Sequence, residues 1–414
     1  MAVFKSFKAV RPLPENAEKI AALPYDVMNS AEAREMVKGN ALSFLHVDKA
    51  EIDLDESIDP YDEKVYLKAR ENLDALQNNG YCKQDEAPCF YIYRQIMNGR
   101  AQTGLVGCAG IDDYINGVIK KHEFTRADKE QDRINHVDYC NANTGPIFLT
   151  YRENDFISAT VSGWKNAHDP VYDFEKEGVQ NTVWVIDDSE TNKKLTEAFS
   201  KIDSLYIADG HHRCASAVKV GLKRRGQFPN YDGSEEFNFF LAVAFPKNEL
   251  AIMDYNRVIK DLNGLTNEEF FEKLSKDFTV EENKKEGTYR PEKRHTFGMY
   301  LDKKWYKLEA KSGSFDENDP VSRLDVSILQ SNCITPIFGI DDPRTDKRID
   351  FVGGIRGLFE LERRCALDMR IAFSMYPTSL DELMDIADAG KVMPPKSTWF
   401  EPKLLSGLFI HKLG

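Results

Sequence analysis

The sequence predicts an α+β fold in which strands and helices are mixed. Apolar runs of strand length alternate with amphipathic helical segments, and Asn98-Gly99 between two such runs is a strong hairpin signal. Frequent hairpins favour a sheet with many antiparallel pairs over a doubly wound parallel one. The chain has 414 residues, 42% of them hydrophobic, which is enough for roughly two to three domains.

The expected elements follow one another from the N-terminus. In the clearest helix, Val65, Ala69, Leu73 and Leu76 share one face. Ser30 is expected to cap a shorter helix. The expected helices are 17–23, 31–36, 60–79, 124–141 and 192–199. The expected strands are 90–94, 103–109, 147–151, 182–186, 202–208 and 239–245, with a further short strand at the N-terminus.

The character of the chain changes after Asp261-Leu262-Asn263-Gly264, which predicts a domain boundary near residue 262. We therefore expect a first domain over 1–262 and a C-terminal α+β domain over 263–414. The second domain is expected to hold a helix after residue 265 and a hairpin formed by 296–300 and 305–308.

The composition of the chain disfavours several classes of binding partner. The formal net charge of −13 disfavours nucleic acid and anionic membranes, because both need a basic surface. Seven cysteines without a Cys-x-x-Cys pair argue against a disulfide framework and a thiolate zinc site. No apolar run approaches the ~18 residues that span a bilayer, and no signal-peptide segment is visible. We expect a cytoplasmic protein with reduced thiols.

The most informative motif is Asp209-Gly210-His211-His212-Arg213, set between a strand-like run and a helical one. A helix start favours anions, because unpaired backbone N–H groups and the helix dipole point outward there. Gly210 allows the backbone to approach a ligand closely. The motif therefore predicts an anion-binding loop. The plainer alternative is a turn whose histidines cap the helix.

A second polar cluster follows the strand-like Gly117-Val118-Ile119. His122 and Glu123 come first, and Arg126 and Arg133 follow at a spacing that can place both on one helix face. Such a face could bind phosphate or carboxylate groups. The alternative is a solvated helix with internal ion pairs.

Two weaker candidates lie in turns. Thr144, in Asn143-Thr144-Gly145-Pro146, offers a hydroxyl beside backbone amides, and Asp26 offers a carboxylate for acid–base chemistry. A plain turn and a helix cap are the alternatives for these positions. Neither His-Glu-x-x-His nor Gly-x-Ser-x-Gly occurs, so zincins and serine hydrolases lack their usual local signals.

The loop from Asp209 to Arg213 resembles the nucleotide-phosphate loop of the ParB/sulfiredoxin superfamily, and above all the Asp-Gly-His-His-Arg loop of the free serine kinases. The whole chain resembles a large bacterial and archaeal family of uncharacterised function, often labelled ParB-like. The stretches that carry this second resemblance are Leu23 to Val27, Ser43 to Val47, Lys120 to Arg126, Asp209 to Arg213, Arg344 to Gly357 and Pro394 to Leu408.

The resemblance implies a ParB/sulfiredoxin-like nucleotide-binding core. About 200 residues precede the loop, far more than in the short serine kinases, so a large insertion over about 50–200 is expected. The implied function is a nucleotide-dependent phosphotransferase acting on a small hydroxylated metabolite. Free serine kinases convert L-serine to O-phosphoserine with ADP or ATP and magnesium, so this is the candidate reaction. The partners would be a nucleotide and a small substrate.

The resemblance also implies roles for individual residues. Gly210, His211, His212 and Arg213 would bind the nucleotide phosphates, and Asp209 would position magnesium or the phosphate loop. The catalytic glutamate of the kinases cannot be placed by motif. Glu123 is the first candidate for this base and Asp26 the second. The candidates for binding the substrate are His122, Arg126, Arg133 and Thr144.

Two rival functions stay open at this point. A ParB-like regulatory or DNA-partitioning protein would fit the family label, but the acidic balance weighs against it. A metal-dependent hydrolase could use His122, His211 and His212 as ligands. Neighbouring histidines such as His211 and His212 rarely both face one ion, so this ligand set is a weak signal.

Overall fold

The computed structural model describes all 414 residues, and the chain forms two compact units. The first unit comprises Met1–Leu250 and Pro402–Gly414, and the second comprises Ala251–Glu401. The second unit thus begins earlier than the boundary expected near residue 262, because the strands Ile252–Met253 and Tyr255–Ile259 already pair within it.

The expected C-terminal domain over 263–414 also ends differently. The last segment of the chain returns to the first unit, where the Val10 N–H donates to the Ile410 carbonyl at 2.9 Å. The strand β21 (His411–Lys412) pairs with β7 (Ala142–Asn143) in the same region. These backbone contacts join the end of the chain to its beginning.

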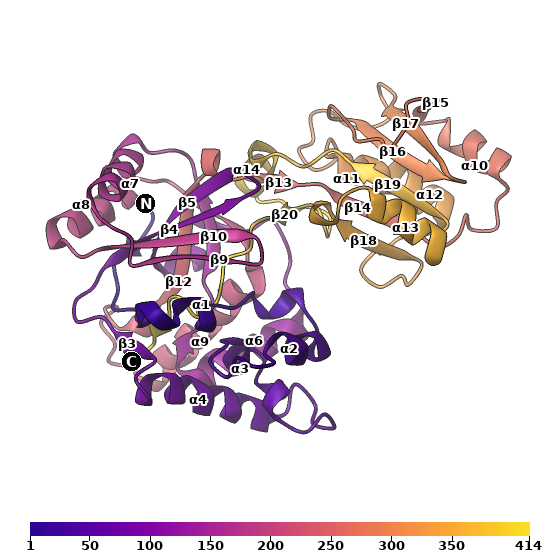
Figure 1. The fold of residues 1–414 in the computed structure, drawn as a ribbon. Coiled ribbons are helices and arrows are strands. Elements are labelled where there is room, and N and C mark those ends of the chain that lie inside the picture. Colours follow the sequence, from indigo (N-terminus) through magenta and orange to yellow (C-terminus); the bar gives the residue numbers. More distant parts are fainter. The chain divides into compact units, whose positions relative to one another are not determined.

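A nine-stranded mixed sheet forms the centre of the first unit (Figure 1). Its strands follow the order β6-β11-β8-β12-β5-β4-β10-β9, with β1 beside β5. The pairs β11–β6 and β12–β8 are parallel, and the others are antiparallel. The predicted α+β class is confirmed. The strands are β1 (Phe4–Lys5), β4 (Phe90–Met97), β5 (Arg100–Gly110), β6 (Ile119–Lys120), β8 (Ile147–Tyr151), β9 (Tyr172–Lys176), β10 (Val179–Ile186), β11 (Leu205–Asp209) and β12 (Phe239–Pro246).

The segment over about 50–200, expected as an insertion, supplies most of these strands. Among them are β4, β5 and β8 in the middle of the sheet. The segment is therefore built into the sheet and does not form a separate body. The hairpin between β4 and β5 turns at Asn98 and Gly99, whose φ angles of 52° and 78° suit a two-residue hairpin turn.

Helices surround the sheet of the first unit. They are α1 (Ala17–Ile20), α2 (Ser30–Met36), α3 (Leu45–Asp48), α4 (Glu63–Asn78), α5 (Ile111–Ile115), α6 (Ala127–Cys140), α7 (Asp155–Ala167), α8 (Ser189–Phe199) and α9 (His211–Gln227). The predicted apolar face of α4 is buried. The cap of α2 is Asn29 and not Ser30, because Asn29 forms a capping box with Glu32. No helix of the chain is both long and apolar enough to span a bilayer.

The core of the first unit contains two large clusters of buried residues. One cluster gathers apolar residues of the sheet with helices α7, α8 and α9, among them Phe4, Leu149 and Ile207. Another packs α3 and α4 against the C-terminal segment at Ile410. All seven cysteines are unpaired, as expected.

The second unit has its own antiparallel sheet, in the order β15-β17-β16-β19-β14-β18. Its strands are β14 (Tyr255–Ile259), β15 (Phe278–Glu282), β16 (Thr296–Leu301), β17 (Lys304–Ala310), β18 (Ile349–Gly353) and β19 (Ile371–Met375). Its helices are α10 (Asn267–Leu274), α11 (Asp325–Leu329), α12 (Thr335–Phe338), α13 (Phe359–Leu367) and α14 (Leu380–Asp388). The expected hairpin of β16 and β17 is present.

A buried carboxyl group makes the stability of the second unit pH-dependent. Asp325 is 8% exposed, and burial raises its pKa from 3.8 to about 7. One oxygen accepts from the His295 N–H at 2.9 Å, and the other has no partner. Because the folded pKa exceeds the unfolded one, this group stabilises the fold fully below about pH 4, and its contribution is lost by about pH 7.

The variant Asp325→Asn should remove this pH dependence. The free energy of unfolding of the wild-type unit should fall by up to about 4 kcal/mol between about pH 4 and about pH 7 relative to the variant. Urea unfolding across this range measures the difference. Asp316→Asn, at an exposed position, is the control and should follow the wild type. Parallel curves for Asp325→Asn and wild type would contradict the assignment.

Candidate functional site

The loop from Asp209 to Arg213 lies where β11 ends and α9 begins. The strand β11 runs parallel to β6, with Leu205 opposite Ile119 and Tyr206 opposite Lys120. The carboxyl ends of parallel strands lie at one edge of a sheet, which is where ligand sites of mixed sheets commonly form. This register therefore brings the residues that follow β6 next to the start of α9.

Gly210 sets the path of the loop. Its φ and ψ of 88° and 32° are left-handed, a conformation that glycine adopts without steric cost. No side chain caps α9, and no acidic residue lies in its first turn. The first N–H groups of the helix are therefore not satisfied by a capping side chain, as an anion site requires.

The three side chains after Gly210 point to different neighbours. His211 is buried, with Nδ1 4.0 Å from Glu123 Oε2. His212 accepts at Nε2 from the Arg126 backbone N–H at 3.0 Å. Arg213 donates to the Pro146 carbonyl at 2.6 Å. Of the three, the Arg213 guanidinium is the group that reaches the cavity described below.

Asp209 is held by two cations. Its Oδ2 lies 3.4 Å from Lys403 Nζ and 3.6 Å from an Arg213 nitrogen. Burial would raise the pKa of Asp209, but these two cations outweigh burial and hold it below its ordinary value. The Asp209 carboxylate already pairs with Lys403 and Arg213. A magnesium ion would add a third positive group beside it. The surroundings of Asp209 therefore do not fit magnesium.

A small, partly open cavity of about 20 Å³ lies beside the loop, large enough for about one water molecule. Two arginines, Arg133 and Arg213, line it. Its wall is formed by residues from the N-terminal segment, α3, α6, the β7–β8 region, α9 and the C-terminal segment. They are Tyr25, Asp48, Arg133, His136, Val137, Asn143, Thr144, Gly145, Ile147, Arg213 and Ser406.

The polar groups of the cavity are fixed by their neighbours. Thr144 donates from Oγ1 to Asp48 at 2.8 Å. The Arg133 guanidinium donates to Asp132 at 2.9 Å and lies over the Tyr25 ring, 4.0 Å from its centre. Thr144 and Arg133 are both buried. The structure thus places two of the expected substrate-binding residues on one cavity with Arg213.

The other expected residues lie around this cavity. Arg126 is exposed, and its guanidinium pairs with Asp128 at 2.8 Å. Asp26 is exposed in the short 3-10 turn Tyr25–Val27. Burial lowers the pKa of His212, and the negative charge of Asp26 partly offsets this effect. Asp26 is thus an electrostatic neighbour of the loop.

His122 joins His211 and Glu123 and not the cavity. The two imidazole rings meet edge to face with centres 4.5 Å apart. Burial lowers the pKa of His122 to about 4 and holds the pKa of His211 well below its usual value. The hydrolase hypothesis had His212 as a third ligand. Because His212 bonds the Arg126 amide, Glu123 takes that place in the cluster.

Sequence reasoning missed three residues of the site: Asp48, Lys403 and Ser406. They lie on α3 and on the returning C-terminal segment, far from the loop along the chain. The sequence did carry an indirect signal, since Ser43 to Val47 and Pro394 to Leu408 are among the stretches that match the resembled family.

Fold and site together define an α+β protein with a glycine-containing loop between the strand β11 and the start of helix α9. The chain belongs to the family described as protein of unknown function (DUF1015), whose model matches residues 4–327. No curated protein matches the chain.

Several solved structures show weak similarity. A free serine kinase variant in complex with AMP has 14% identity and a TM-score of 0.35, covering 74% of this chain and 89% of the other. A C-terminally truncated SbnI from Staphylococcus aureus has 12% identity and a TM-score of 0.37, covering 73% and 85%. A conserved hypothetical protein from Pyrococcus furiosus has 14% identity and a TM-score of 0.34, covering 76% and 97%. These TM-scores are too low to establish a shared fold.

The substitution Gly210→Ala should destabilise the first unit more than a matched glycine substitution. A Cβ at Gly210 would lie 3.0 Å from Arg213 Nε, so the guanidinium would have to shift by a few tenths of an ångström, which weakens its hydrogen bond to the Pro146 carbonyl. Gly80 has a similar φ of +76° with open space around it. Both variants should lose about 1 kcal/mol from left-handed strain, and Gly210→Ala about 1 kcal/mol more. Urea unfolding compares them, and equal losses would contradict this account.

Proposed function

We propose that this protein is a nucleotide-dependent phosphotransferase, a small-molecule kinase that uses ADP or ATP. The observation that carries the proposal is the pair of guanidinium groups, Arg133 and Arg213, on one cavity at the uncapped start of α9. Guanidinium groups bind phosphate or carboxylate through two parallel hydrogen bonds. Backbone N–H groups at a helix start add further donors for phosphate oxygens.

The proposed acceptor is a small hydroxylated metabolite, and free L-serine giving O-phosphoserine is the specific reaction. The choice of serine, like the proposed ParB/sulfiredoxin relation, rests on the resemblance of the Asp209 to Arg213 sequence to the loop of the free serine kinases. A serine carboxylate would suit Arg133, and Thr144 offers a hydroxyl beside it. His122 and Arg126 do not line this cavity, because the His122 ring packs against His211 and the Arg126 guanidinium pairs with Asp128.

The nucleotide phosphates would lie against Gly210, Arg213 and the first N–H groups of α9, with His212 at the edge. In the transfer, the acceptor oxygen forms a bond to the terminal phosphorus while the bond to the nucleotide oxygen breaks. The acceptor hydroxyl loses its proton to a carboxylate. Glu123 and Asp26 are the candidates, and the side chain of Glu123 is 43% exposed.

Product formation tests the reaction directly. Purified full-length protein is incubated with ADP or ATP, magnesium chloride and L-serine, and O-phosphoserine is measured by mass spectrometry. Calorimetry with each nucleotide tests binding separately. If a nucleotide binds but no phosphoserine forms, serine is not the acceptor. The proposal of a phosphotransferase then stands with a different acceptor. If neither nucleotide binds, the proposed function is wrong.

The variant Arg213→Lys should weaken nucleotide binding by at least about 10-fold, because lysine keeps the charge but cannot form two parallel hydrogen bonds to a phosphate. Calorimetry with ADP and ATP measures the change. The matched control is Arg224→Lys on the same helix, where Arg224 pairs with Asp138 at 2.9 Å. Equal affinities for wild type and Arg213→Lys would show that Arg213 does not touch the nucleotide.

Comparing Glu123→Gln with Asp26→Asn identifies the base. Removing the general base should lower kcat by about 100- to 10,000-fold and leave the nucleotide affinity nearly unchanged. Steady-state kinetics with the acceptor measure this effect. If both variants keep the wild-type kcat, neither carboxylate accepts the proton.

A further inference from the structure

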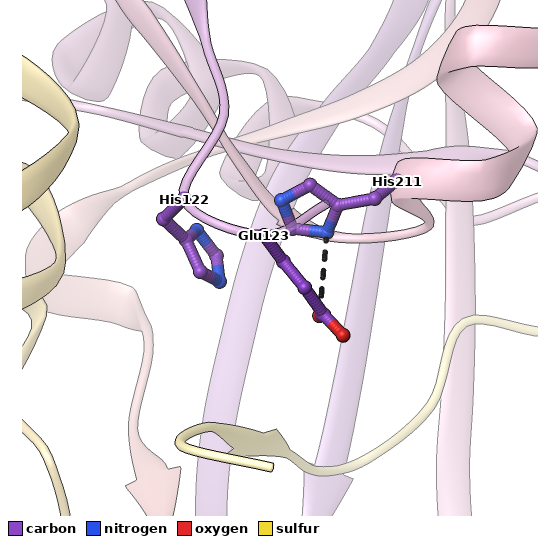
Figure 2. A group of neighbouring side chains, drawn as sticks. All are labelled: His122, Glu123 and His211. Atoms are coloured by element: carbon purple, nitrogen blue, oxygen red, sulfur yellow. Dashed lines mark ion pairs between the residues drawn. The ribbon is translucent and has the colours of Figure 1, made fainter. Parts of the chain in front are cut away.

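A compact cluster of one carboxylate and two imidazoles lies at the edge of the sheet, apart from the arginine-lined cavity. The parallel register of β6 and β11 places His122 and Glu123 beside His211, the first residue of α9. One ligand atom from each residue can be chosen so that all three lie within 4.8 Å of one another. Figure 2 shows the three side chains together, with the Glu123 carboxylate reaching toward the His211 ring.

These distances suit a shared ion better than direct hydrogen bonds. The 4.0 Å between His211 Nδ1 and Glu123 Oε2 is too long for a hydrogen bond. At tetrahedral angles, bonds of about 2.0–2.2 Å to one metal hold its ligand atoms about 3.4 Å apart. The chosen atoms of the cluster all lie within 4.8 Å of one another, so side-chain rotations that move them by about 1 Å can bring them to one ion.

Both histidines of the cluster are buried, but not all of their ring nitrogens are hydrogen-bonded. His122 is 2% exposed, and neither of its ring nitrogens makes a well-formed hydrogen bond, with only a weak contact to the Ile207 carbonyl. His211 is 6% exposed, and its Nε2 has no hydrogen-bond partner. An unsatisfied buried polar group costs about 1–3 kcal/mol. A ligand that engages His122 would remove part of this cost.

We propose that His122, Glu123 and His211 bind one divalent transition metal. Two imidazole nitrogens and one carboxylate oxygen suit zinc, iron, cobalt or manganese, whereas magnesium prefers oxygen ligands. Three protein ligands leave coordination positions for water or for a substrate oxygen. Glu123, whose side chain is 43% exposed, gives the ion access from solvent.

The metal site is independent of the proposed nucleotide reaction, because it needs no phosphate. It does bear on the choice of base. A carboxylate that binds a metal cannot also take the proton of the acceptor hydroxyl, so the proposal assigns Glu123 to the ion and leaves Asp26 for proton transfer.

Metal binding is tested on the full-length protein after removal of bound ions with a chelator. Titration with Co²⁺ is followed by visible absorption, and titration with Zn²⁺ by calorimetry, both with excess magnesium present. We expect one ion per chain in the wild type and an affinity at least about 10-fold lower in Glu123→Gln. The control His168→Gln changes an exposed histidine on another helix end and should bind as the wild type does.

A second measurement separates ligand loss from misfolding. Zn²⁺ should raise the Tm of the wild type, because only the folded chain presents the three ligands together. It should not raise the Tm of Glu123→Gln, whose melting without metal should match that of the wild type.

Three outcomes would overturn the site. The wild type binds neither ion stoichiometrically, Glu123→Gln binds as tightly as the wild type, or His212→Gln loses the ion while Glu123→Gln keeps it. The last result would show that His212, and not Glu123, is the third ligand.

Discussion

The short parallel pairing of β6 with β11 is the constraint on which the site depends. It is only two residue pairs long, yet it fixes where the chain after β6 meets the start of α9. A one-residue slip would turn every following side chain to the opposite face. His122 would then no longer lie beside His211, and the hydrogen bond between Arg126 and His212 would be lost.

The same loop separates two environments with different chemistry. On one side, His122 and His211 are buried and uncharged beside Glu123. On the other side, Arg133 and Arg213 are charged and face a cavity. The start of α9 makes this separation possible, because successive residues of a helix point about 100° apart. Gly210 turns the chain from β11 into that helix. An anion and a metal cation can therefore have adjacent sites without sharing a ligand.

Local signals predicted the local structure. The Asn98-Gly99 turn and the apolar face of α4 depend on residues close in sequence, and both are present. The cap of α2 was also available from the sequence, since Asn29 and Glu32 form a capping box that Ser30 does not. The segment from Asp209 to Arg213 lies between a strand and a helix as expected, because glycine and the change of periodicity mark that junction.

The features that the sequence did not predict depend on contacts between distant parts of the chain. The hydrolase hypothesis grouped His122 with His211, but nothing in the sequence indicated the β6–β11 pairing that brings them together, because β6 is only two residues long. The turn residues near Gly264 placed the predicted domain boundary after Ala251, where the second unit begins. Only the strand pairing shows this earlier start. Asp48 and Lys403 were missed for the same reason.

The return of Pro402–Gly414 to the first unit has a consequence for biosynthesis. Lys403, one of the two cations that hold Asp209, leaves the ribosome only after the entire second unit has been translated. Until then that carboxylate can pair with Arg213 but not with Lys403. The site is thus completed only after the second unit has been synthesised, and premature termination within that unit would yield a first unit with an unfinished loop.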